Sequence, residues 1–210
     1  MKRVVVVDYG MGNLFSVCRA LEATGASVLL TSNPDEIQNA ERLVLPGVGA
    51  FAEGMAEIGR RGLADPILAF AKTGRPLLGI CLGMQLMFES GEEFGTHEGL
   101  GLLPGSVVML PTSNPTFGSF KIPHIGWNKL AMTGQCKSWN NTILKNTAPD
   151  SFVYFVHSYE CKPVIEQHCI ARTEYCGCTI AAVVRKDNIS GCQFHPEKSG
   201  KTGLGILTDF

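Results

Sequence analysis

The residue best suited to act as a nucleophile is Cys81, which stands between Gly79 and Gly83 in a Gly-x-Cys-x-Gly pattern. The apolar run before it predicts a buried strand, and the helical spacing that continues to Glu89 predicts a helix beginning at the cysteine. Paired glycines suit a sharp strand-to-helix turn that lifts the central side chain out of the sheet. The unpaired N–H groups of a helix start would favour the thiolate. A small buried hydrophobic residue at a strand end is the alternative interpretation of Cys81.

A general base for this thiol is found in His195, which is followed by Pro196 and Glu197. In an extended segment His195 and Glu197 point to the same side, and a proline favours an extended residue before it. A histidine oriented by a carboxylate is the part of a catalytic triad that an isolated cysteine lacks. His157 is the competing base, but it has no carboxylate within two residues. We therefore favour His195 over His157, while a solvated His and Glu after a strand remains the alternative.

The elements that must position these residues follow the pattern of an α/β protein. The β-branched run 4–7 predicts a buried parallel strand, residues 27–30 and 42–45 predict two more, and residues 63–72 predict an amphipathic helix. Asn13 is a predicted N-cap for the helix after the first strand. The third strand leads into residues 46–49, Pro-Gly-Val-Gly, which leave backbone N–H groups unpaired at the carboxyl edge of the sheet. Open α/β sheets bind ligands at that edge, although an ordinary glycine turn is possible here.

The second half of the chain has shorter predicted strands and frequent glycine and proline from residue 91 onward. Residues 152–159 predict a strand, and 181–185 with 189–194 predict a hairpin. We interpret residues 122–128, which include Trp127, as a loop, and residues 134–149 as a polar loop without a strong motif. We expect one domain, residues 1–210, with an open, mostly parallel sheet, flanking helices and added antiparallel strands.

Composition excludes several classes of function. With 18 Lys and Arg against 19 Asp and Glu, there is no electrostatic case for binding nucleic acid or an anionic membrane. No run approaches the roughly 18 apolar residues of a membrane helix. The 8 cysteines have no framework spacing, which favours a reducing, cytoplasmic setting. Cys161, Cys169, Cys176 and Cys178 contain no Cys-x-x-Cys pair, so we predict neither a metal nor a cofactor.

Three separated motifs together resemble the class I glutamine amidotransferases: residues 79–85, residues 46–49 and His-Pro-Glu at 195–197. The resemblance spans residues 4–199. Within that class, residues 8–13, residues 123–128 and residues 195–199 are similar to one branch. Its glutaminase subunits supply ammonia to a (β/α)8-barrel synthase of amino-acid biosynthesis.

The resemblance implies a flavodoxin-like core and hydrolysis of L-glutamine to glutamate and ammonia through a Cys81, His195 and Glu197 triad. It implies an oxyanion hole formed by the N–H of Leu82 and by the 46–49 segment, at Val48 or Gly49, after a peptide flip. It also implies that the barrel subunit and its nucleotide ligand complete this hole. The other residues carried over are Gln85, Ser158 and Tyr159 for glutamine, and Asn13, Trp127, Tyr154 and Lys198 for the partner face.

Three other functions stay open. The glutaminase subunits of anthranilate and aminodeoxychorismate synthases share the elbow and the His-Pro-Glu motif, but they usually carry histidine where this chain has Met84. A stand-alone cysteine hydrolase would need no partner. A non-catalytic binding protein would require the three motifs to coincide by chance.

Overall fold

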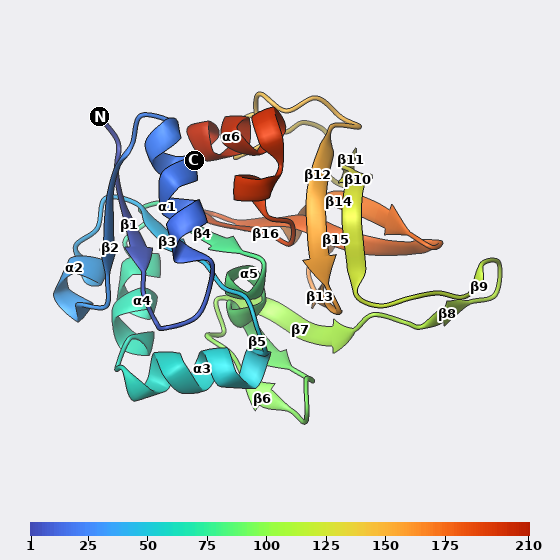
Figure 1. The fold of residues 1–210 in the computed structure, drawn as a ribbon, viewed down its shortest axis with the longest axis horizontal. Helices are drawn as coiled ribbons and strands as arrows, with labels where there is room; N and C mark the ends of the chain where they lie inside the picture. The colour runs from blue at the N-terminus through green and yellow to red at the C-terminus, as the bar shows by residue number, and fades with distance from the viewer.

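A central eight-stranded sheet organises the computed structural model, which describes residues 1–210 (Figure 1). Its strand order is β11-β14-β15-β16-β4-β3-β1-β2. The parallel part comprises β2 (Ser27–Thr31), β1 (Arg3–Val7), β3 (Leu43–Leu45), β4 (Leu77–Ile80) and β16 (Ile189–Cys192). The antiparallel part adds β15 (Cys178–Lys186), β14 (Cys169–Tyr175) and β11 (Ala131–Met132). The predicted α/β class, a mostly parallel sheet with antiparallel additions, is confirmed.

Helices cover both faces of this sheet, and each face has its own hydrophobic cluster. Strand β1 shows why, since Val5 and Val7 enter one cluster while Val4 and Val6 enter the other. Figure 1 shows α1 (Leu14–Ala23) and α6 (Gly200–Asp209) on one side of the sheet. The other side carries α2 (Pro34–Gln38), α3 (Phe51–Arg60) and α4 (Ala64–Ala71). None of the helices has the length and apolar character needed to cross a membrane.

Smaller sheets extend the structure beside the carboxyl end of β4. One has the order β13-β7-β5-β6 and comprises β13 (Tyr159–Pro163), β7 (Leu103–Met109), β5 (Phe88–Gly91) and β6 (His97–Glu98). A two-stranded ribbon joins β10 (His124–Lys129) to β12 (Phe152–His157), and a projecting hairpin joins β8 (Ser113–Asn114) to β9 (Gly118–Ser119) (Figure 1). Two short 3-10 helices complete the elements: η1 (Glu166–His168) and η2 (Pro196–Lys198).

Two local predictions are wrong. The helix after Cys81, α5 (Leu82–Leu86), ends before Glu89, because Phe88 starts a strand that pairs with β7. The spacing of residues within a fully buried apolar run does not distinguish a helix from a strand. Residues 124–129 form β10 rather than a loop, since they pair along their whole length with β12. Residues 134–149 contain no helix or strand, as predicted for a loop, but the loop is not polar throughout, because Trp139 and Leu144 are buried in the hydrophobic cluster that packs against α1 and α6.

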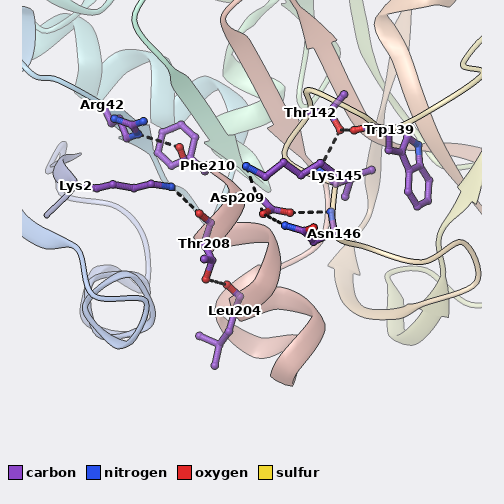
Figure 2. Close-up of polar contacts among 11 residues, drawn as sticks. Lys2, Arg42, Trp139, Thr142, Lys145, Asn146, Leu204, Thr208, Asp209 and Phe210 are labelled. Carbon is purple, nitrogen blue, oxygen red and sulfur yellow. Dashed lines mark hydrogen bonds and ion pairs between the residues drawn. The ribbon is translucent and has the colours of Figure 1, made fainter.

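Figure 2 shows how the end of α6 anchors this segment and the amino ends of β1 and β3. Asp209 accepts hydrogen bonds from the backbone N–H of Asn146 at 3.0 Å and from its side chain at 2.6 Å. Arg42 Nε donates to the Phe210 carbonyl at 2.9 Å, and Lys2 Nζ donates to the Thr208 carbonyl at 2.6 Å. These contacts join segments that lie far apart in the sequence.

Candidate active site

The turn at Cys81 has the strained geometry expected of a nucleophile elbow. Cys81 joins β4 to α5 with φ 52° and ψ −110°, a conformation that side-chain-bearing residues rarely adopt. A Cβ atom on Gly79 would lie 2.7 Å from the Gly83 carbonyl oxygen, and one on Gly83 would collide with the Leu45 carbonyl oxygen. The two glycines are therefore required by close backbone contact, as the sequence pattern predicts.

A cavity of about 320 Å³ opens at this elbow. It is lined by residues of α5, β12, β13 and the loops between elements, including Cys81 in the turn after β4, so groups separated by more than a hundred residues in the chain face one space. All the residues expected at the oxyanion hole and at the glutamine site line this cavity, together with the predicted nucleophile Cys81 and the predicted base His195. The lining residues are Val48, Gly49, Cys81, Leu82, Gln85, Glu93, Pro123, Val156, His157, Ser158, Tyr159 and His195.

His195 is oriented by a buried carboxylate. Its Nδ1 lies 2.8 Å from Glu197 Oε1, and the two side chains are 3% and 1% exposed. His195 Nε2 has no hydrogen-bond partner within the chain, so the second ring nitrogen is available to the cavity. The expected extended geometry is wrong beyond His195, because Pro196 starts the helical turn η2. That turn, which Ser199 closes by donating to the His195 carbonyl at 2.7 Å, is the element that places Glu197 beside the ring.

The charge state of His195 follows from its neighbours. Burial lowers the pKa of His195, but its interactions with Cys81 and with the Glu197 carboxylate outweigh burial and raise that pKa to about 9. The imidazolium is thus the favoured form at neutral pH. Such a ring can stabilise a cysteine thiolate and can later donate a proton.

Replacing Glu197 by glutamine is expected to lower the pKa of His195 and to slow hydrolysis at least about 10²-fold. A folded-state pKa of about 9, above the ordinary 6.5, means that the stabilisation is complete below pH 6.5 and disappears as the pH rises to 9. The difference in unfolding free energy between wild type and Glu197→Gln should therefore narrow over that range. Urea titrations at several pH values, with histidine NMR, measure both effects.

The exposed Glu166 offers a matched control, since Glu166→Gln should change neither the His195 titration nor the rate. A stability difference that stays constant from pH 6 to pH 10 would contradict this account of the His195 and Glu197 pair.

The 46–49 segment is fixed at both ends and unpaired in its middle. The Tyr9 hydroxyl donates to the Pro46 carbonyl at 2.7 Å, and Glu93 Oε2 accepts from the Phe51 N–H at 2.7 Å. Between these points the N–H groups of Val48 and Gly49 make no hydrogen bond within the chain. Leu82, at the first position of α5, also has an N–H without a helical partner. Two sets of unpaired donors thus border one cavity.

The residues predicted to bind glutamine, Gln85, Ser158 and Tyr159, also line the cavity. Gln85 Nε2 donates to the Tyr159 carbonyl and to Gln193 Oε1, each at 3.1 Å. Ser158 lines the cavity while its carbonyl accepts from the Leu110 N–H at 2.9 Å. The polar atoms of these residues are therefore held by contacts between separate elements of the fold.

Two functional candidates were missed from the sequence. Glu93 lies in a turn with no motif, so only the fold shows its place in the cavity wall. Gln193 Nε2 points to Cys81 Sγ at 3.8 Å, a weak contact. The sequence could have indicated Gln193, because Gln193 stands two residues before His195. In an extended segment the two side chains therefore point to the same side.

The residues predicted to face a partner lie on elements that contact one another. Trp127 and Tyr154 are cross-strand neighbours on β10 and β12, with ring centroids 6.0 Å apart, and Trp127 is 55% exposed. Lys198 is exposed on η2, which packs against both β12 and α1. Asn13 caps α1 by accepting from the Ser16 N–H at 3.4 Å, as predicted. All four therefore lie on adjoining elements.

Comparison with known proteins defines the class. The model of the glutamine amidotransferase class-I family matches residues 5–210, and the chain belongs to that family. A solved glutamine amidotransferase superposes with a TM-score of 0.70 at 17% identity, covering 95% of this chain and 94% of that one. The structure of PurLQS from Thermotoga maritima superposes with a TM-score of 0.72 at 20% identity, covering 99% and 96%. These structures show the shared fold.

Within the class, the chain groups with the imidazole glycerol phosphate synthase subunits named HisH. It is 51% identical over 210 residues to subunit HisH 1 of Legionella pneumophila (strain Lens), covering 100% of this chain and 99% of that protein. It is 47% identical over 205 residues to HisH of Bacillus licheniformis, covering 98% and 93%. The resemblance drawn from the three motifs is confirmed, and the alternative of a non-catalytic binding protein is set aside.

Proposed function

We propose that this chain hydrolyses L-glutamine and passes the ammonia to a (β/α)8-barrel synthase subunit, which makes imidazole glycerol phosphate in histidine biosynthesis. The observation that carries the proposal is the His195 and Glu197 pair, joined at 2.8 Å with Nε2 unpaired, in the cavity that also holds Cys81. The choice of this synthase as the partner rests on the names of the HisH relatives, which are subunits of imidazole glycerol phosphate synthase. We also propose that residues 1–210 act as one glutaminase domain, in the cytoplasm, where its eight cysteines stay free.

The chemistry follows from three groups. Cys81 Sγ attacks the side-chain amide carbon of glutamine, and the C–N bond breaks as His195 Nε2–H protonates the departing ammonia. This leaves a glutamyl thioester on Cys81. His195 Nε2 then takes a proton from water, whose oxygen attacks the thioester and releases glutamate. Glu197 holds the ring in one orientation throughout, which is the role its 2.8 Å contact with Nδ1 supports.

The oxyanion formed in both steps needs hydrogen-bond donors. Leu82 N–H supplies one, and the unpaired N–H of Val48 or Gly49 supplies the second once the peptide turns toward the cavity. Gly49 has φ 108°, a conformation open to glycine, which makes that turn accessible at this position. Loss of one such donor typically costs about 10²- to 10³-fold in rate, so the segment can control the reaction.

The substrate is expected to bind across the cavity. Gln85, Ser158, Tyr159 and Glu93 all line it. A carboxylate and an amide oxygen suit the cationic α-amino group of an amino acid. The partner would cover the surface of Asn13, Trp127, Tyr154 and Lys198, where an exposed aromatic side chain is typical of an interface core.

Co-purification of the chain with the barrel subunit, followed by a glutaminase assay, tests the proposal. We expect slow hydrolysis by the isolated chain and at least about 10²-fold stimulation in the complex with its nucleotide ligand, because a second oxyanion donor is then in place. Full activity without any partner would favour a stand-alone cysteine hydrolase. Stimulation by an anthranilate synthase subunit instead would favour that amidotransferase.

A further inference from the structure

Two buried histidines form a hydrogen-bonded pair at the cavity, next to the residues predicted to bind glutamine. His124, the first residue of β10, and His157, the last residue of β12, are directly opposite each other and are 2% and 6% exposed. His124 Nδ1 lies 3.0 Å from His157 Nε2, and His157 Nδ1 lies 2.8 Å from the Tyr159 carbonyl oxygen. The His124 ring is stacked between the rings of Phe155 and Tyr175, at 4.9 and 4.2 Å.

These contacts determine where the protons are. A carbonyl oxygen only accepts, so His157 Nδ1 carries the hydrogen and its Nε2 is the acceptor. His124 Nδ1 must then be the donor to that nitrogen. Burial supports neutral rings, because it lowers the pKa of both His124 and His157 to about 4. His157, the competing base in the sequence, therefore has neither ring nitrogen free for a thiol proton.

The hydrogen bond to Tyr159 decides how Gln85 presents its amide. The Tyr159 carbonyl accepts from His157 Nδ1 and from Gln85 Nε2, which uses both of its lone pairs. The other hydrogen of Gln85 Nε2 is donated to Gln193 Oε1 at 3.1 Å. A flipped Gln85 amide would set its oxygen against two acceptors, so the oxygen is turned away from them and makes no hydrogen bond within the chain.

We propose that His124 and His157 are positioning residues of the glutamine site. By fixing the Tyr159 carbonyl they fix the Gln85 amide, whose oxygen is thereby presented as an acceptor for the amino group of the substrate. This inference rests on the proposed function, and neither histidine makes a hydrogen bond to Cys81, His195 or Glu197. The pair should control the affinity for glutamine and leave the chemical step unchanged, which separates it from the Cys81, His195 and Glu197 group.

Two replacements of His157 isolate the hydrogen bond. Asparagine places its amide nitrogen where Nδ1 stands and keeps the donor to Tyr159, whereas phenylalanine keeps the ring volume without any donor. In the complex with the barrel subunit and its ligand, His157→Phe should raise the KM for glutamine about tenfold, the worth of a hydrogen bond. Its kcat should stay within about threefold of wild type, with an unchanged pH profile. His157→Asn should keep a KM near the wild-type value.

A second variant guards against misfolding. His124→Phe keeps the stacked ring but removes the donor to His157 Nε2, so it should raise KM in the same direction by about threefold. Calorimetric binding of glutamine to complexes carrying Cys81→Ser should show the same shifts in Kd, without hydrolysis.

Different results would overturn different claims. If the wild-type complex hydrolyses no glutamine, the proposed function fails and this inference fails with it. If the wild type is active, three findings would each overturn the inference alone. One is an unchanged KM in both His157→Phe and His124→Phe. Another is an equal rise in KM for His157→Asn and His157→Phe, which would show that the effect comes from altered packing and not from the lost hydrogen bond. The third is a large fall in kcat with an altered pH profile.

Discussion

Exchange of Cys81 for serine is expected to lower the rate of glutamine hydrolysis by about 10⁴-fold or more while leaving the fold intact. A serine hydroxyl remains protonated at neutral pH, so the attacking group is lost although its position is kept. The fold should be kept, because Sγ makes only long contacts with the Val156 carbonyl and with Gln193, at 3.9 and 3.8 Å, although the stabilisation that comes from the interaction of Cys81 with His195 is lost. A coupled assay for glutamate, run in the complex, measures the rate.

Cys18 on α1 provides the control, since it is a partly buried cysteine outside the cavity and Cys18→Ser should hydrolyse at the wild-type rate. A diazo-ketone analogue of glutamine should label the wild type at Cys81 and leave Cys81→Ser unlabelled. Hydrolysis by Cys81→Ser within tenfold of wild type would remove Cys81 from the proposed mechanism.

The second large effect is expected on stability. Gly83→Ala should destabilise the fold by about 3 kcal/mol or more, because its Cβ would overlap the Leu45 carbonyl oxygen and force β3 and α5 apart. Gly59, a helical glycine in α3, is the matched control. No atom lies within 4 Å of the place that a Cβ would occupy there, so Gly59→Ala should be neutral or stabilising by about 0.5–1 kcal/mol.

Urea denaturation of the two alanine variants, followed by circular dichroism, makes this comparison. Equal stabilities for the two variants would show that the elbow can relax and that close contact between Gly83 and Leu45 is not needed. A loss of activity in Gly83→Ala at full stability would point to displacement of Cys81 alone.

The parallel half of the fold is predictable because its signals are local. Residues 4–7 are a continuous β-branched run, and Asn33 with Pro34 marks the start of α2. The helix α3 and the strand β10 were missed for a different reason. Ala50 gives α3 no side-chain cap, and β10 depends on pairing with β12 some thirty residues later in the chain. Tertiary contact, rather than local preference, forms these elements.

The residues of the candidate site likewise fall into those with a local sequence signal and those found only from the fold. Cys81 stands out by its flanking glycines, and His195 by the nearby Glu197, so both could be found from the sequence alone. The roles of Tyr9, Glu93 and His124 depend on single contacts across the fold, to Pro46, Phe51 and His157. No periodicity encodes such contacts.

The anchoring of the segment between Pro46 and Phe51 has a thermodynamic consequence. A peptide that turns between two fixed ends moves one medium-sized apolar side chain, Val48, which is already 40% exposed. Such a turn changes little apolar area and so carries almost no heat-capacity change. Covering the exposed aromatic side chain of Trp127, at 55%, and the apolar surface around it would carry a negative heat-capacity change. The equilibrium constants for binding of the proposed partner and for the turn of the Val48 peptide would therefore depend differently on temperature, although one binding event would produce both.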